Sequence, residues 1–110
     1  MKHIEFIKKF EFGGEIQSEK DIEAKQLYKG SGRQIMEIKL RNNAVLSKHK
    51  AAEPITVFCL AGNGKFLAGE NLEDEHLLEK GTFITLEANI LHEVSAESEL
   101  HIIVTKFKQD

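Results

Sequence analysis

Apolar and polar residues alternate along much of the chain, a pattern typical of β-strands that bury one face. The segment 33–40 alternates in this way, and with 26–29 it flanks the turn residues 30–32, which predicts a β-hairpin. Asn42 and Asn43 come next and predict a turn, because asparagine tolerates left-handed backbone. The first half of the chain therefore indicates strands joined by tight turns.

The densest run of β-branched and aromatic residues is 55–60. It is expected to form a strand that ends at Gly62-Asn63-Gly64 and pairs with 65–68 as a hairpin. Residues 18–21 carry a weak capping-box signal, which predicts one short helical turn. Further strands are expected at 3–12, 44–49, 75–78, 82–86 and 100–105. Roughly eight to ten short strands without a long helical segment predict an all-β sandwich or barrel.

Composition places the chain among ordinary globular domains. Its 110 residues are 41% hydrophobic and 30% charged, which predicts one domain over residues 1–110. The formal net charge of -3 and the lack of a long basic run argue against nucleic-acid binding. A single cysteine, Cys59, excludes an intramolecular disulfide and favours a reducing, cytoplasmic location. No segment has the apolar length of a membrane span, and the N-terminus does not resemble a signal peptide, so no membrane association is expected.

Histidines are the main candidates for chemistry, and His49 and His92 stand out because each lies at an expected strand boundary. The stretch 43–62 fits the spacing G-x5-H-x-H-x3-E-x6-G without a gap, with His49 at the first histidine position. The stretch of about 81–96 fits the spacing G-x5-P-x-G-x2-H, with Gly81 and His92 in place but Glu87 and Asn89 at the proline and second glycine. These spacings are the two motifs of the cupins, and the chain resembles that family over about residues 34–105.

The resemblance implies a jelly-roll barrel, also called a double-stranded β-helix, with a metal site of three histidines and one carboxylate. Only two of these four positions are filled, because Ala51 stands at the second histidine position and Ile55 at the carboxylate position. Such sites suit divalent Fe, Mn, Ni or Zn, and they generally supply at least three protein ligands. With His49 and His92 alone, metal binding is expected to be weak or absent.

A third metal ligand would have to come from outside the motif positions. Glu53 lies close to the first motif, and His101 lies in the last expected strand. Either residue is a candidate third ligand. In the alternative without a metal, His101 and His76 are expected to be surface residues of their strands.

The two replacements make the expected barrel interior more apolar than a metal site. Ile55, Val57 and Cys59 alternate along one strand and would share its inward face. An apolar wall with a few convergent polar groups is typical of a small-molecule pocket. The predicted ligand pocket comprises His49, Ala51, Ile55, Val57, Cys59 and His92.

Three functions follow as hypotheses, since a fold alone does not define an activity. The first is a cytoplasmic barrel that binds a small molecule, or a metal weakly, at a degenerate metal site. The second is a metal-dependent oxidoreductase or isomerase that uses His49 and His92. The third is a sensory or interaction module without chemistry. A homodimer is also expected, because the alternating segment 5–12 offers an unpaired strand edge and the resemblance implies dimers.

Overall fold

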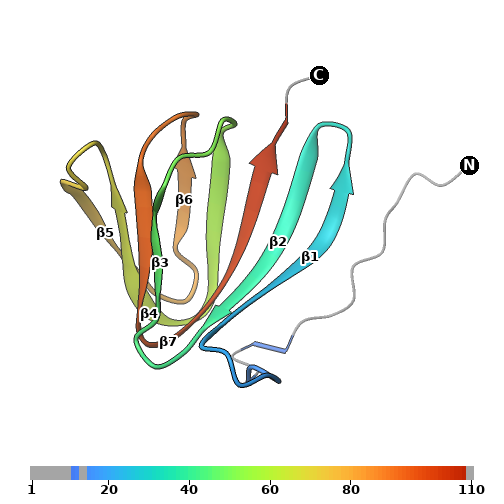
Figure 1. Ribbon diagram of the computed structural model, residues 1–110, viewed down its shortest axis with the longest axis vertical. Coiled ribbons are helices and arrows are strands. Elements are labelled where there is room, and N and C mark those ends of the chain that lie inside the picture. Colours follow the sequence, from blue (N-terminus) through green and yellow to red (C-terminus); the bar gives the residue numbers. More distant parts are fainter. Residues whose placement is uncertain (1–10, 13–14, 109–110) are drawn as a thin grey trace, which may run out of the picture.

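The computed structural model describes residues 11–12 and 15–108, and every regular element in them is a β-strand. The predicted all-β class is confirmed (Figure 1). The strands in chain order are β1 (Ile22–Gly30), β2 (Arg33–Leu40), β3 (Val45–His49), β4 (Ile55–Ala68), β5 (Asp74–Leu78), β6 (Phe83–Leu86) and β7 (His92–Phe107). The described residues include no helix with the length and apolar character needed to cross a membrane.

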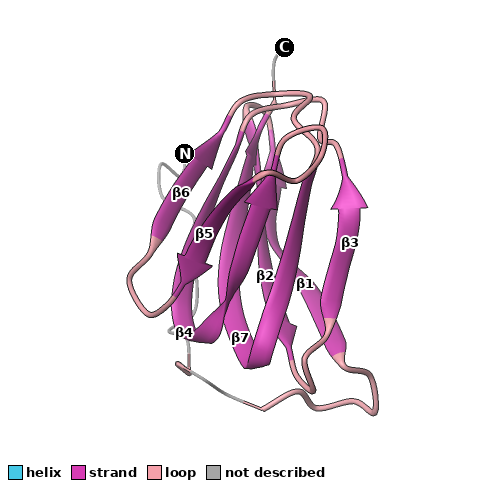
Figure 2. Ribbon diagram, turned by 90° about the vertical axis from the view of Figure 1, so that its left-hand side faces the viewer, coloured by secondary structure: helices cyan, strands magenta, loops and turns pink. Residues whose placement is uncertain are grey.

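Two long strands, β4 and β7, pair with each other in antiparallel fashion and form the centre of the sheet, whose order is β1-β2-β7-β4-β5. The first half of β4 pairs with β6, and the second half of β7 pairs with β2. The remaining halves pair with β5 and β3. Each long strand therefore contributes to two layers, and the sheet curves over on itself (Figures 1 and 2).

The hydrophobic core lies between these two layers and draws side chains from both. Alternation along a strand sends every second side chain inward, so the apolar positions of β4 and β7 meet in the middle. Full burial of a side chain such as Phe66, which is 1% exposed, stabilises a fold by roughly 1.5–3 kcal/mol. The buried cluster comprises Leu40, Ile55, Val57, Cys59, Phe66, Ala68, Leu78, Val94, Ala96, Leu100 and Ile102.

The predicted first hairpin is confirmed. β1 and β2 pair from Gly30 and Arg33 outward, and Gly32 in the turn has a φ of 83°. The predicted asparagine turn is confirmed as well, since Asn42 and Asn43 have φ values of 56° and 58°. The Oδ1 atom of Asn43 accepts a hydrogen bond from the Ser98 backbone N–H at 2.8 Å, which ties this turn to the bend in β7.

The hairpin predicted at Gly62-Asn63-Gly64 is wrong. The chain continues through these residues as the single strand β4, and register shifts interrupt its pairing with β7 there. Gly62 has a φ of 84°, and a Cβ atom on it would collide with the backbone carbonyl of Glu99. The glycines therefore allow β-bulges and close backbone contact where the long strands bend, not a reversal of the chain.

The helical turn predicted at 18–21 is also wrong, because this segment is a bend before β1. The Ser18 carbonyl accepts a hydrogen bond from the Arg41 guanidinium at 2.9 Å, and the Asp21 carbonyl accepts one from the Arg41 backbone N–H. Two carbonyls that would accept hydrogen bonds within a helix thus accept them from Arg41, in the turn between β2 and β3. The strand predicted at 3–12 lies almost wholly outside the described residues.

Candidate functional site

His49 and His92 come together, as the motif spacing suggested. His49 ends β3 and His92 begins β7, and the two residues are direct partners in the pairing of these strands. Their ring centroids are 4.3 Å apart, with the planes inclined by 60°. The pairing of two strand ends thus produces one pair of imidazoles from residues 43 positions apart in the sequence.

Both rings are held by a hydrogen bond to the backbone two residues earlier. Nδ1 of His49 lies 3.0 Å from the Ser47 carbonyl oxygen, and Nδ1 of His92 lies 2.9 Å from the Ile90 carbonyl oxygen. A carbonyl oxygen only accepts hydrogen bonds, so each Nδ1 carries the proton and donates it. In the neutral form each ring therefore keeps its lone pair on Nε2, the arrangement in which an imidazole accepts a hydrogen bond or ligates a metal.

His92 is the buried member of the pair. It is 3% exposed and stacks on the Phe66 ring at a centroid distance of 5.7 Å, whereas His49 is exposed. Burial lowers the pKa of His92 below its ordinary value, and the nearby His49 and Lys106 lower it further. The Ile90 carbonyl opposes these effects. His92 is therefore neutral at pH 7.

The Nε2 atom of His92 is open to a ligand. In the part of the chain that the structure describes, the His92 ring forms a hydrogen bond through Nδ1 alone. No fully buried side-chain nitrogen or oxygen of these described residues lacks a partner. The unpartnered Nε2 must therefore keep some contact with solvent. Because His49 is exposed and packs against His92, a ligand can approach from the His49 side.

The other predicted pocket residues lie on the inner face of the fold. Ile55, Val57 and Cys59 are at most 4% exposed and belong to the core cluster, and Ala51 packs against that cluster. Burial raises the pKa of the Cys59 thiol, whose Sγ lies 3.5 Å from the Ala61 carbonyl oxygen. The inward alternation predicted for β4 is confirmed, while a ligand pocket along this wall stays a prediction.

The donor set does not fit a metal site of the cupin kind. Among the described residues, no group of three or more His, Cys, Asp or Glu side chains is placed to hold a metal ion. Glu53 lies in the connection between β3 and β4 and does not complete such a group with His49 and His92. Two imidazoles are fewer than the three protein ligands usual in catalytic metal sites. No step of chemistry through a metal follows from this arrangement.

His101, the other candidate third ligand, lies on the opposite face of the sheet. Its neighbours Leu100 and Ile102 point into the core, so the alternation of β7 turns His101 outward. The expectation that His101 is a surface residue is wrong, because it is 3% exposed. Its Nε2 lies 2.7 Å from a Glu37 carboxylate oxygen. By contrast, His76 is exposed, as predicted.

The Glu37–His101 pair was missed by the reasoning from sequence. Its two members are 64 residues apart and meet only because β2 pairs with β7. One local signal was present in the sequence. Apart from His101, every residue of 100–104 is apolar, so apolar side chains fall on both faces of this strand. A continuous apolar run indicates a strand that is covered on both faces.

The sequence matches no protein-family model. It also matches none of the curated proteins. Solved structures, by contrast, superpose over most of the chain. A cupin superfamily protein from Desulfitobacterium hafniense DCB-2 has a TM-score of 0.77 at 10% identity, covering 86% of this chain and 84% of that one.

Two further structures agree with this result. An RmlC-like cupin family protein with a double-stranded β-helix fold, from Methanocaldococcus jannaschii, has a TM-score of 0.71 at 16% identity, covering 84% of this chain and 86% of that one. A conserved protein of unknown function from Streptococcus pyogenes has a TM-score of 0.76 at 14% identity and covers 99% of each chain. The protein therefore has the cupin fold, a double-stranded β-helix, as the sequence motifs predicted.

Proposed function

We propose that this cupin-fold protein binds a small molecule at the His49–His92 pair and takes up divalent metal there only weakly. The observation that carries the proposal is the geometry of the pair, with rings 4.3 Å apart and both Nδ1 protons donated to backbone carbonyls. This arrangement leaves one Nε2 lone pair on each of two rings that are in contact. Ala51 and Ile55, at the positions of the remaining cupin ligands, add no donor atoms.

The chemistry of the pair favours a ligand that donates hydrogen bonds. Burial lowers the pKa of His92, so its Nε2 accepts and does not donate at neutral pH. A hydroxyl, amine or amide group fits two neighbouring acceptors of this kind. Phe66, buried beneath His92, stacks on its ring and would keep the ring in place for such a ligand.

Histidine side-chain NMR tests this proposal with defined probes. Ribose, glycerol, acetamide and Zn²⁺ would each be titrated into the isotope-labelled protein while the Nε2 resonances of His49 and His92 are followed. We expect at least one organic probe to shift both resonances, and Zn²⁺ to bind with a dissociation constant no tighter than about 1 μM. His49→Ala should weaken both effects about tenfold, and His76→Ala, at an exposed histidine elsewhere, should leave them unchanged.

The opposite pattern would contradict the proposal. Nanomolar Zn²⁺ binding that requires both histidines would support the metal-dependent alternative. Organic probes that move no resonance of the pair up to about 10 mM, together with weak Zn²⁺ binding, would leave a module in which the two histidines serve the fold alone.

A further inference from the structure

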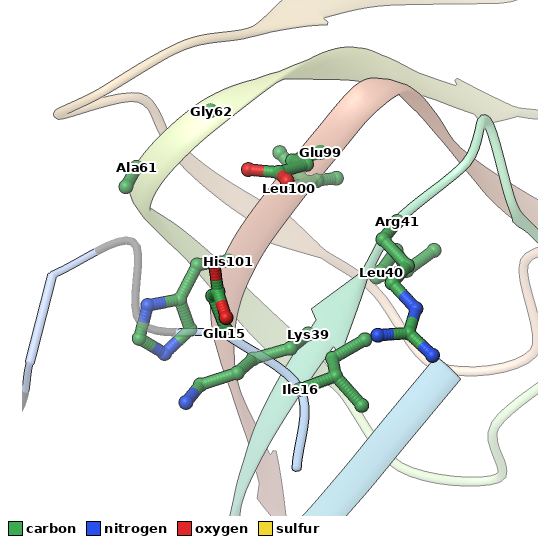
Figure 3. A pocket seen from close by; sticks show the side chains of 10 residues that line it. All are labelled: Glu15, Ile16, Lys39, Leu40, Arg41, Ala61, Gly62, Glu99, Leu100 and His101. Carbon is green, nitrogen blue, oxygen red and sulfur yellow. The ribbon is translucent and has the colours of Figure 1, made fainter. Parts of the chain in front are cut away.

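A second candidate site lies on the face of the sheet that points away from the core. A cavity of about 220 Å³, partly open to solvent, lies between this outer face and the segment that precedes β1. Lys39 of β2, His101 of β7 and Ala61 of β4 stand side by side in the strand pairing and form its floor. Glu15 and Ile16 cover it from the other side (Figure 3).

This cavity is separate from the His49–His92 pair. In β7, the side chains of Val94 and Ile102 point inward, on the same face as His92, whereas His101 points outward. The body of the sheet thus lies between the two sites. A ligand in the outer cavity would leave the histidine pair untouched, so this inference does not depend on the proposed function.

His101, which lines the cavity, belongs to a buried polar pair with Glu37. The side chain of His101 is 3% exposed and that of Glu37 is 12% exposed, with 2.7 Å between Nε2 and the carboxylate oxygen. Apolar residues in place of such a pair are often neutral or stabilising, so stability alone does not account for it. The bond to Glu37 does fix the orientation of the His101 ring, which makes one wall of the cavity rigid and polar.

Three other charged side chains that line the cavity form no ion pair with any residue that the structure describes. Within the described residues, neither Lys39 nor the carboxylates of Glu15 and Glu99 form an ion pair, although all three line the cavity. Arg41, across the cavity from Lys39 in Figure 3, is already engaged by Asp21 at 3.4 Å. The unpaired set is one ammonium group and two carboxylates within one small space.

We propose that this outer cavity binds a zwitterion of amino-acid size, a molecule with one carboxylate and one ammonium group. Lys39 would pair with the ligand carboxylate, and Glu15 and Glu99 with its ammonium group. The volume of about 220 Å³ corresponds to roughly seven water molecules and is smaller than a drug-sized pocket. A dicarboxylate would meet the two glutamates, and a diamine would meet Lys39, so both are disfavoured by like charge.

Amide NMR with three probes of similar length tests the assignment: γ-aminobutyrate as the zwitterion, succinate as the dicarboxylate and putrescine as the diamine. We expect γ-aminobutyrate to shift the amides of Lys39, Ala61 and His101 and to bind at least tenfold more tightly than the other two probes. Lys39→Met and Glu99→Gln should each weaken γ-aminobutyrate binding about tenfold. Lys29→Met, an exposed lysine of β1 outside the cavity, is the matched control and should have no effect.

Three results would overturn the inference. The first is the absence of shifts at these amides up to about 10 mM γ-aminobutyrate in the folded parent protein. The second is equal binding of all three probes. The third is binding that moves His49 and His92 instead, which would assign the zwitterion to the histidine pair. Because Glu99 is exposed, Glu99→Gln is expected to fold normally. This variant keeps the test decisive if Lys39→Met fails to fold.

Discussion

His92 stacks on the Phe66 ring and contacts the His49 ring, and this environment determines its chemistry. A histidine in water changes charge near pH 6.5, but burial stabilises the neutral form. The Ile90 carbonyl fixes the proton on Nδ1, which leaves Nε2 as an acceptor. One residue therefore combines a defined tautomer, a defined charge and an open nitrogen, and these properties make it the centre of the candidate site.

The lowered pKa of His92 predicts that acid weakens the fold. In the unfolded chain the imidazole gains a proton as the pH falls through about 6.5, while in the folded protein it stays neutral to a lower pH. The unfolded state then binds more protons, so the free energy of unfolding decreases below pH 6.5, by at most about 1.4 kcal/mol per pH unit. Urea denaturation at pH 7.5 and 5.5 measures this loss.

The variant His92→Leu should show a smaller loss between the two pH values than the parent, because the titrating group is gone. His76→Leu, at an exposed position, should lose as much stability between the two pH values as the parent does. An equal pH dependence in the parent and in His92→Leu would show that other groups are responsible.

At the scale of single elements, β4 and β7 define the architecture because each contributes to both layers. Their bend coincides with the bulges around Gly62 and with Ser98, whose φ is 67°. The backbones approach so closely there that only glycine fits at position 62. The bend also separates the half of β7 that carries His92 from the half that carries His101.

Substitution at Gly62 tests the role of this bend. An alanine there would adopt left-handed backbone, which costs about 1–2 kcal/mol, and its Cβ would also collide with the Glu99 carbonyl. Gly62→Ala should therefore lower the free energy of unfolding by at least about 2 kcal/mol in urea denaturation. Gly32→Ala is the matched control, since Gly32 has a φ of 83° but open space around it, and should cost only about 1 kcal/mol. Equal losses would show that contact with β7 does not matter.

The strands could be predicted from sequence where the evidence is local. The alternation of 33–40 and the two asparagines determine their own structure, and the structure confirms both. The Gly62-Asn63-Gly64 segment was misassigned because two nearby glycines suit a tight turn and a bulge equally well. Only the distant partner β7 decides between them, and a local pattern carries no information about that partner.

The candidate sites also differ in how far local sequence determines them. Motif spacing placed His49 and His92 at strand boundaries, and the structure brings them together. The Glu37–His101 pair and its cavity could not be predicted, because they depend on β2–β7 pairing and on the segment around Ile16 covering the outer face. Burial created by a segment far away in sequence is a tertiary property.

At the scale of the whole molecule, one cupin fold carries two candidate sites on opposite faces of a curved sheet. The inner site uses paired imidazoles, and the outer one uses unpaired charges around a buried Glu37–His101 pair. The homodimer stays a prediction. Exposed aromatic side chains on the outer face, Phe58 and Phe83 with ring centroids 6.0 Å apart, are consistent with an interface there.

We propose that the inner site lacks the donors of a metal centre and acts through two imidazoles alone. Elemental analysis of untagged protein, with His49→Ala and His92→Ala purified in parallel, tests it most directly. We predict a metal content well below one ion per chain in all three proteins. Close to one ion per chain in the parent, lost in both variants, would contradict the claim and establish a rebuilt metal centre.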